Sequence, residues 1–94
     1  MALSLSRGGS GLVEKLDLSA MGRRIRIERA RLDISQQELA TKARIQQKTV
    51  AQIERGRQHG LSVATLAAIA DALDNLSLDY LMYGQMPRRK GGEE

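Results

Sequence analysis

Apolar residues recur at helical spacing along the chain, and several of these stretches open with the same local signal. An apolar residue precedes a polar N-cap, and a second apolar residue follows four positions after the cap, which is the pattern of a hydrophobic staple. The clearest case is Ile34, Ser35 and Leu39, where Glu38 also completes a capping box with Ser35. β-branched residues never alternate with polar ones over a useful length, so we predict an all-α fold. The staple recurs at Leu61 with Ser62 and Leu66, at Leu76 with Ser77 and Leu81 and, with a poorer cap, at Ile45 with Gln46 and Val50.

These signals predict five helices in one compact domain. The first spans residues 19–32 with Ser19 as its cap, and Gly56 and Gly84 supply the left-handed stops of the third and fifth helices. The second and third helices are short, are joined by a tight turn and carry small residues where they would cross. They form a predicted helix-turn-helix unit. The residues predicted to face the core are Met21, Ile25, Leu32, Leu39, Ala40, Ala43, Val50, Ile53, Leu66, Ile69, Ala70, Leu73 and Leu81.

Chain length limits the organisation around this domain. The sequence has 94 residues, enough for a five-helix core but not for a second globular unit. We predict a flexible N-terminal extension with a short amphipathic segment in residues 1–18, the domain in residues 19–84, and a basic disordered tail in residues 85–94. The apolar side chains of the amphipathic segment, Leu12, Val13 and Leu16, are expected to dock on the first helix around Ile27, either within one subunit or across a dimer. The alternative is that Ile27 is an isolated exposed residue.

The outward face of the third helix is rich in amides and cations. A glutamine can form a bidentate pair with adenine N6 and N7, and a lysine can reach guanine O6 or N7. The face is therefore suited to base edges in a DNA major groove. A merely solvated helix surface is the alternative, but the setting inside a capped helix-turn-helix favours base reading. The candidate base-reading residues are Gln46, Gln47, Lys48 and Gln52.

Charge is distributed unevenly along the chain. The net charge is +4, yet residues 19–59 hold ten Lys and Arg against four Asp and Glu, whereas residues 60–84 hold three Asp and no cation. One half of the fold is therefore expected to attract a polyanion, with the other half free for contacts of another kind. The run of Arg88, Arg89 and Lys90 is interpreted as a solvated tail, with a phosphate-touching arm as the alternative.

The residue inventory disfavours several other classes. His59 is the single histidine, cysteine is missing, and no acidic pair has a spacing typical of catalysis, so we expect no enzyme, no metal site and no cofactor. Two Tyr without Phe or Trp offer little surface for base stacking, which disfavours RNA. No apolar run approaches the roughly 20 residues of a membrane span, and no signal-type segment opens the chain, so we expect a cytoplasmic protein that is nucleoid-associated when bound to DNA.

Residues 21–84, about two thirds of the chain, resemble the helix-turn-helix family of phage repressors and Cro proteins, together with their bacterial relatives. Relatives serve as repressors, activators, restriction-modification controllers and antitoxins, so the resemblance is more specific for fold than for function. The residues that carry it are Ile25, Arg29, Ser35-Gln36-x-Glu38-Leu39-Ala40, Val50, Ile53-Glu54-x-Gly56, Leu66, Ile69-Ala70-x-Ala72-Leu73 and Leu78-x-x-Leu81.

The resemblance implies roles for individual residues. Gln36, in the first turn of the second helix, is expected to bind a DNA phosphate with help from backbone N–H groups and the helix dipole. Arg29 and Glu54 match a buried ion pair that ties the first helix to the end of the third, with two unrelated surface charges as the alternative. The third-helix residues named above occupy the positions from which the family reads bases. The nearby cations expected at phosphates are Arg44, Arg55 and Arg57.

Three departures from the family pattern affect the corners. Arg44 stands where the family usually has Gly between the second and third helices, so either the turn is rebuilt or Arg44 carries left-handed strain of roughly 1–2 kcal/mol. Gln46 is a weaker N-cap than the Ser or Thr common at that position. The Asp74-Asn75 corner is one residue longer than the usual version that contains Gly.

Together these features predict a sequence-specific, double-stranded DNA-binding transcription regulator. We expect a repressor that binds a two-fold symmetric operator as a homodimer. The alternative is an antitoxin or protein-interaction module with a protein partner, whose DNA binding is autoregulatory.

Overall fold

A computed structural model of the protein describes residues 16–57 and 61–92. These residues contain five α-helices and a final 3-10 turn, with no strand beyond an isolated bridge, so the predicted all-α, five-helix fold is confirmed. The elements are α3 (Leu18–Leu32), α4 (Gln36–Ala43), α5 (Gln47–Glu54), α6 (Val63–Ala72), α7 (Leu78–Tyr83) and the 3-10 turn η1 (Lys90–Gly92).

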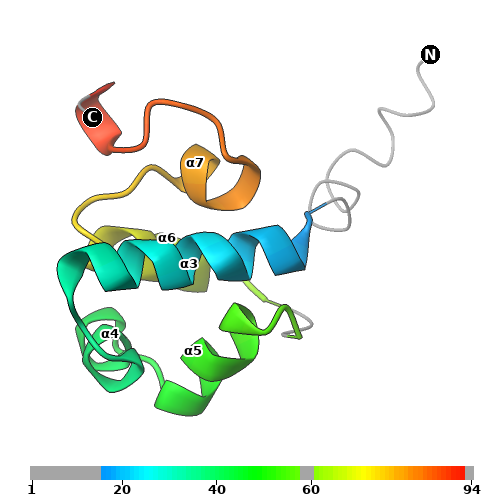
Figure 1. Ribbon diagram of the computed structural model, residues 1–94, viewed down its shortest axis with the longest axis vertical. Helices are drawn as coiled ribbons and strands as arrows, with labels where there is room; N and C mark the ends of the chain where they lie inside the picture. The colour runs from blue at the N-terminus through cyan, green and yellow to red at the C-terminus, as the bar shows by residue number, and fades with distance from the viewer. Residues whose placement is uncertain (1–15, 58–60, 93–94) are drawn as a thin grey trace.

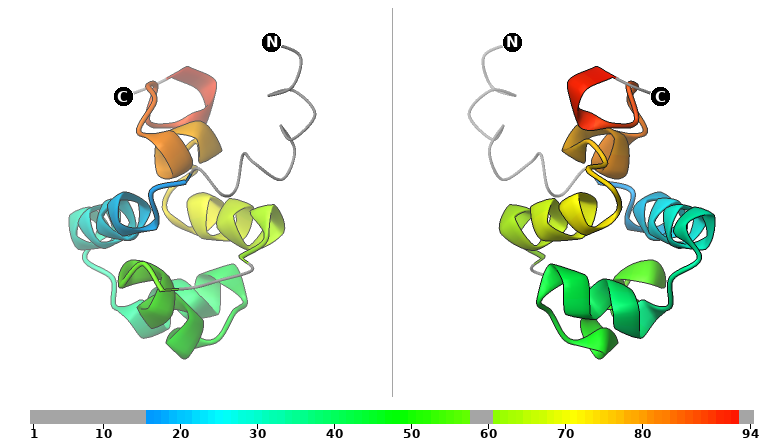
Figure 2. Two further views of the ribbon diagram at one scale, coloured as in Figure 1. Left: turned by 90° about the vertical axis from the view of Figure 1, so that its right-hand side faces the viewer. Right: turned by 90° about the vertical axis from the view of Figure 1, so that its left-hand side faces the viewer.

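The helices are arranged in three levels. α4 and α5 lie at one end of the molecule, α3 and α6 cross its middle, and α7 lies at the other end beside the C-terminal segment (Figure 1). Seen from the sides, α3 and α6 lie next to each other above the pair formed by α4 and α5 (Figure 2). α3 packs against α5 and α7, and α6 packs against α4 and α7. The helix-turn-helix unit therefore occupies one end of the protein.

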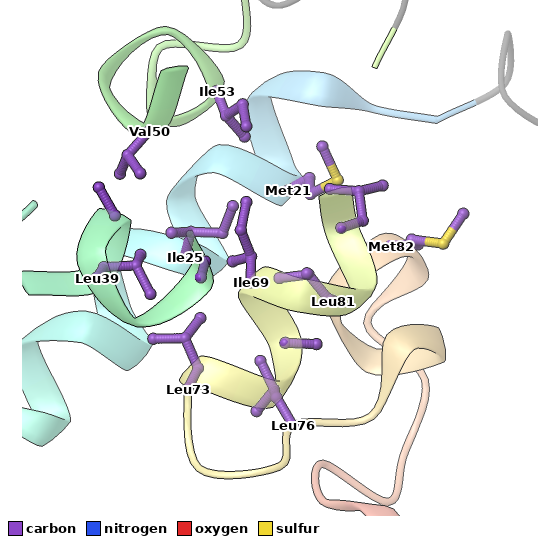
Figure 3. Close-up of a cluster of buried hydrophobic side chains, with 14 of the residues drawn as sticks. Met21, Ile25, Leu39, Val50, Ile53, Ile69, Leu73, Leu76, Leu81 and Met82 are labelled. Atoms are coloured by element: carbon purple, nitrogen blue, oxygen red, sulfur yellow. The ribbon is translucent and has the colours of Figure 1, made fainter. Parts of the chain in front are cut away.

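The core lies where these helices meet. Figure 3 shows Ile25, Leu39 and Ile69 converging from α3, α4 and α6. Every residue predicted to face the core is buried except Leu32, which is half-buried against it. The core also takes in three residues outside that prediction, Leu16, Leu76 and Met82.

Local capping starts α4, α6 and α7 where the sequence predicts. The Oγ atoms of Ser35, Ser62 and Ser77 accept hydrogen bonds from the backbone N–H three residues later. The capping box is complete, because the Glu38 carboxylate accepts the Ser35 N–H at 2.8 Å. Gly84, with φ of 74°, ends α7 in the predicted left-handed conformation.

The predicted cap of the first helix is wrong. Asp17, not Ser19, is the N-cap of α3, and its carboxylate accepts the Ala20 N–H at 3.0 Å. Leu16 before the cap and Met21 four positions after it are both buried. This is the same apolar, cap, apolar spacing found at the other helices, with aspartate in the place of serine.

The expected docking of the N-terminal segment on Ile27 can be tested within one chain only at Leu16, and for this residue it is wrong. Leu16 packs into the main core, and 49% of Ile27 remains exposed. Leu12 and Val13 lie outside the described residues. Residue 16 therefore belongs to the folded domain, which begins before the predicted boundary at residue 19.

The C-terminal segment is not the predicted disordered tail over residues 85–92. It returns to the corner between α6 and α7, where the Arg88 carbonyl accepts the Ser77 N–H at 2.7 Å and the Asn75 carbonyl accepts the Lys90 N–H at 3.0 Å. These two bonds flank an antiparallel bridge between Leu76 and Arg89. The longer Asp74-Asn75 corner has φ of 64° and 57° at its two residues. It directly precedes Leu76, which forms the bridge with Arg89 of the segment.

The basic run in this segment is not a solvated tail, because all three of its cations meet acidic side chains. Arg89 Nη2 lies 2.9 Å from Asp74 Oδ2, and Lys90 Nζ pairs with Asp71. Arg88 Nε lies 3.6 Å from Oε2 of Glu28, a buried carboxylate of α3. The three cations thus neutralise acidic groups at the end of the molecule away from α5 (Figure 1).

Candidate nucleic-acid interface

Helix α5 presents two chemically different sides. Val50 and Ile53 are buried in the core, which fixes the rotation of the helix. Gln46 is its N-cap but makes no side-chain cap hydrogen bond, so its amide is not used to start the helix. The exposed side carries all four candidate base-reading residues, Gln46, Gln47, Lys48 and Gln52.

A hydrogen-bond network ties this surface to the interior. Arg29 meets the Glu54 carboxylate with two bonds, Nε to Oε2 at 2.8 Å and Nη2 to Oε1 at 3.1 Å. Its remaining Nη1 donates to the Ile34 carbonyl at 3.1 Å. The side chain of Glu54 is 3% exposed and that of Arg29 is 20% exposed, so the predicted pairing exists and is largely buried. Hydrogen bonding to Glu54 raises the pKa of Arg29.

Gln36 extends the network from Glu54 to the recognition surface. Its Nε2 donates to Glu54 Oε1 at 3.0 Å, and its Oε1 accepts a long bond from Gln47 Nε2 at 3.4 Å. The amide nitrogen has a second N–H that neither bond uses. Gln36 therefore orients Gln47 in the free protein, while its predicted phosphate contact stays a prediction.

The turn between α4 and α5 is not rebuilt around Arg44. This residue has φ of 61° and ψ of 43°, and its N–H donates to the Ala40 and Thr41 carbonyls at the end of α4. A non-glycine side chain in this conformation costs roughly 1–2 kcal/mol. The strain expected from the sequence is thus present, and it holds an exposed guanidinium beside the start of α5.

Two further predicted phosphate residues follow α5. Arg55 is the C-cap of the helix, and Gly56 with φ of 73° turns the chain so that the Arg57 N–H donates to the Gln52 carbonyl at 3.0 Å. Both arginines are exposed. Together with α3 they border a shallow groove of about 330 Å³ lined by Ser19, Arg23, Arg26, Glu54, Arg55 and Arg57.

Arg23 and Arg26 received no role from the sequence, which marked them only as part of a basic region. Their spacing of three residues places them on one face of α3, and this periodicity was the available signal. Which helix that face meets depends on the packing of α3 against α5. Elsewhere, the described residues contain no group of three His, Cys, Asp or Glu arranged to hold a metal ion.

Comparison with known proteins agrees with this geometry. A sequence model of the helix-turn-helix family matches residues 25–81. The restriction-modification controller protein C.AhdI from Aeromonas hydrophila is 30% identical, with a TM-score of 0.65 over 70% of this chain and 97% of that one. The P22 c2 repressor, solved with a synthetic operator, is 34% identical, with a TM-score of 0.64 over 69% and 96% of the two chains.

The SinR protein, solved in a complex with the SinI protein, is 32% identical with a TM-score of 0.62, and the match covers 67% of this chain and 60% of that one. A search of curated protein sequences gave no significant match. The chain belongs to the helix-turn-helix family, as its resemblance to phage repressors predicts. None of the helices in residues 16–57 and 61–92 is long and apolar enough to cross a membrane.

Proposed function

We propose that this protein represses transcription by binding a two-fold symmetric DNA operator as a homodimer. Membership of the helix-turn-helix family supports a DNA-binding transcription regulator, and the P22 c2 repressor supports the repressor assignment because its structure contains an operator. The observation that carries the proposal is the exposed row of amides on α5, one of which is held in place from the interior through Gln36.

Direct reading of bases would come from α5. In a major groove, Gln46, Gln47 and Gln52 can pair with adenine edges, and Lys48 can reach guanine. Gln47 is the best placed of these residues for specificity, because its bond to Gln36 restricts its rotamers before DNA arrives. A side chain that is already ordered loses less conformational entropy on binding.

Phosphate contacts would set the position of α5 along the duplex. The N-terminus of α4 offers backbone N–H groups and the positive end of the helix dipole, with Gln36 in its first turn. Arg44 lies at one end of α5 and Arg55 and Arg57 lie at the other. Cations at both ends of a recognition helix can hold the two strands that border one major groove.

The experiment that tests this function is selection of bound fragments from a pool of random duplex DNA. We expect an enriched sequence with two-fold symmetry and a complex that contains two protein chains, measured by analytical ultracentrifugation. An enriched but asymmetric sequence bound by one chain would contradict binding as a homodimer. A pool without enrichment would remove sequence-specific binding itself.

A protein-interaction role is the second candidate, and the SinR similarity favours it because that structure is a complex with another protein. A shallow groove of about 590 Å³ lies away from α5, lined by apolar residues and by Lys42, Asp71 and Asp74 among others. An antitoxin-like role predicts a stoichiometric partner that copurifies with the protein from its native cells. Purification of the chain alone under those conditions would count against this candidate.

A further inference from the structure

We propose that the groove between α3 and the end of α5 binds the phosphodiester backbone of DNA next to the bases that α5 reads. We call it the arginine groove and define it by Arg23, Arg26, Arg55 and Arg57. The inference rests on the proposed function and deepens it, because it adds two residues of α3 to a DNA interface that otherwise consists of the helix-turn-helix unit and the residues that follow it.

The groove exists because α3 packs very closely on the last turn of α5. A Cβ at Gly22 would lie 2.5 Å from the Glu54 carbonyl oxygen and 2.6 Å from that of Ile53, so only glycine fits there. Arg23 directly follows Gly22 and Arg26 lies about one turn further along α3, and both are exposed. The contact brings them beside Arg55, and Figure 1 shows the end of α5 under the N-terminal half of α3.

The charges in the arginine groove are not balanced by the protein. None of its four arginines lies within ion-pair distance of a carboxylate among the residues that the structure describes. Glu54 also borders the groove, but its carboxylate is almost fully buried and is already bound by Arg29 and Gln36. Four guanidinium groups thus face a shared solvent-filled space without a counter-charge.

Cations at the other end of the molecule are treated differently. Arg31, at the end of α3, pairs with Glu28, and the cations of the C-terminal segment pair with Glu28, Asp71 and Asp74. Ion pairing thus occupies Arg31 and the cations of the C-terminal segment, whereas the four groove arginines have no such partner among the described residues. Arg24, which faces α7, is bonded differently and donates to the Leu81 carbonyl at 3.0 Å. An external anion is the ligand that would complete the arginine groove.

Its position favours a DNA phosphate over a separate small anion. Arg55 directly follows α5, and Arg57 is bonded through its N–H to Gln52, a candidate base-reading residue. The groove begins where the recognition surface ends, so a backbone that leaves the major groove beside Gln52 would run into it. Guanidinium groups bind phosphate in a bidentate manner and carry no sequence preference in doing so.

The test measures the salt dependence of DNA affinity for the variant Arg23→Gln/Arg26→Gln. Each lost phosphate contact should lower the slope of log K against log salt concentration by about 0.9, so the double variant should lose about 1.8 for each bound protomer and about 3.6 for a homodimer on its operator. Affinity should fall by the same factor on the selected operator and on random duplex, with the preferred bases unchanged. The variant Arg23→Lys/Arg26→Lys should restore much of the slope because it restores the charge.

The matched control is Arg31→Gln/Lys90→Gln, which removes the same charge from residues that pair with acids. Melting temperatures of all variants, followed by circular dichroism, exclude loss of folding. If the Gln variant of the groove shows the same salt slope as the control, while the wild type still prefers its operator, the proposed phosphate site is wrong but the proposed function stands. A wild type that binds no duplex would overturn the proposed function as well.

Inorganic phosphate distinguishes DNA from a free anion as the source of the phosphate group. If the groove serves DNA, added phosphate should produce no saturable rise in melting temperature that depends on Arg23 and Arg26. A saturable rise that the Gln variant abolishes, together with an unchanged DNA salt slope, would assign the groove to a free anion and overturn the proposal.

Discussion

Glu54 connects the interior of the domain with its recognition surface. Its two carboxylate oxygens accept hydrogen bonds from Arg29 on α3 and from Gln36 on α4, and Gln36 in turn meets Gln47. A buried carboxylate needs such partners, because an ionised group without them is strongly penalised in a medium of low dielectric. The same contacts that stabilise Glu54 therefore connect three helices with Gln47, a candidate base-reading amide.

Replacement of Arg29 by Met, or of Glu54 by Leu, should lower the free energy of unfolding by roughly 3–5 kcal/mol, because each leaves the other charge unpaired. The double replacement should be milder than the sum of the two. Urea denaturation of the four proteins in this cycle measures the coupling. As a control, Arg31→Met on the same helix should cost no more than about 1 kcal/mol. Small, additive effects at Arg29 and Glu54 would show that the pair does not stabilise the fold.

Gln47→Ala should reduce discrimination at one or two base pairs per half-site by about 1–3 kcal/mol, since a positioned amide is lost from a base edge. Affinities for the selected operator and for single-base variants of it provide the measurement. Gln85→Ala, an exposed amide that directly follows the C-cap of α7, is the control and should change nothing. Equal weakening on operator and random duplex would argue against base reading by Gln47.

Arg44→Gly should change stability and affinity in opposite directions. Glycine relieves left-handed strain of about 1 kcal/mol, so thermal unfolding should shift upward. The same change removes a cation beside the start of α5, so DNA affinity should fall and its salt slope should decrease by about 0.9 for each bound protomer. A variant that is less stable and binds DNA as well as the wild type would contradict both parts.

The C-terminal segment is the element whose role changes most between sequence and structure. Deletion of residues 86–94 removes two main-chain hydrogen bonds to the Asn75–Ser77 corner and takes Arg88 away from the buried Glu28. We expect a loss of roughly 2–4 kcal/mol in the free energy of unfolding, because Glu28 is left buried with a weaker partner. DNA affinity of the folded fraction should remain unchanged, since the segment lies at the end away from α5.

Two further variants of the chain serve as controls for this deletion. Removal of residues 93 and 94 alone should leave unfolding unchanged. Glu28→Gln in the shortened chain should recover part of the lost stability, because it removes a buried carboxylate charge that no longer has Arg88 beside it. Identical urea midpoints for the full and the shortened chain would show that residues 86–92 contribute nothing to the fold.

The charges of the molecule are polarised, because Arg23, Arg26, Arg55 and Arg57 beside α5 have no ion pair among the described residues, whereas the cations of the C-terminal segment beside α7 are paired with acids. Two copies that present α5 to one face of a duplex should contact half-sites about one helical turn apart, ~10–10.5 base pairs centre to centre. Footprinting of the selected operator, with the spacer lengthened by half a turn as the control, measures this. Equal affinity for both spacings would rule out rigid two-fold binding.

Much of the fold follows from the sequence because its signals are local. Ser35, Ser62 and Ser77 cap helices by reaching an N–H three residues away, and the staples span five residues, so no knowledge of the fold is needed to see them. The missed start of α3 at Asp17 obeys the same local rule. The exposed row on α5 was predictable for the same reason, because helical periodicity alone separates it from Val50 and Ile53.

The sequence by itself determined where the helices begin, which of their faces are apolar and which half of the chain is basic. Only the tertiary structure decided which cations stay available for a ligand. Arg88 forms an ion pair with Glu28, whereas Arg23 and Arg26 form none with an acid among the described residues. Ion pairs between distant segments depend on how the helices pack, and here a close contact at Gly22 and a returning C-terminal segment make that choice. Helical periodicity predicted the exposed amide-rich side of α5, and only helix packing placed Arg23 and Arg26 beside it.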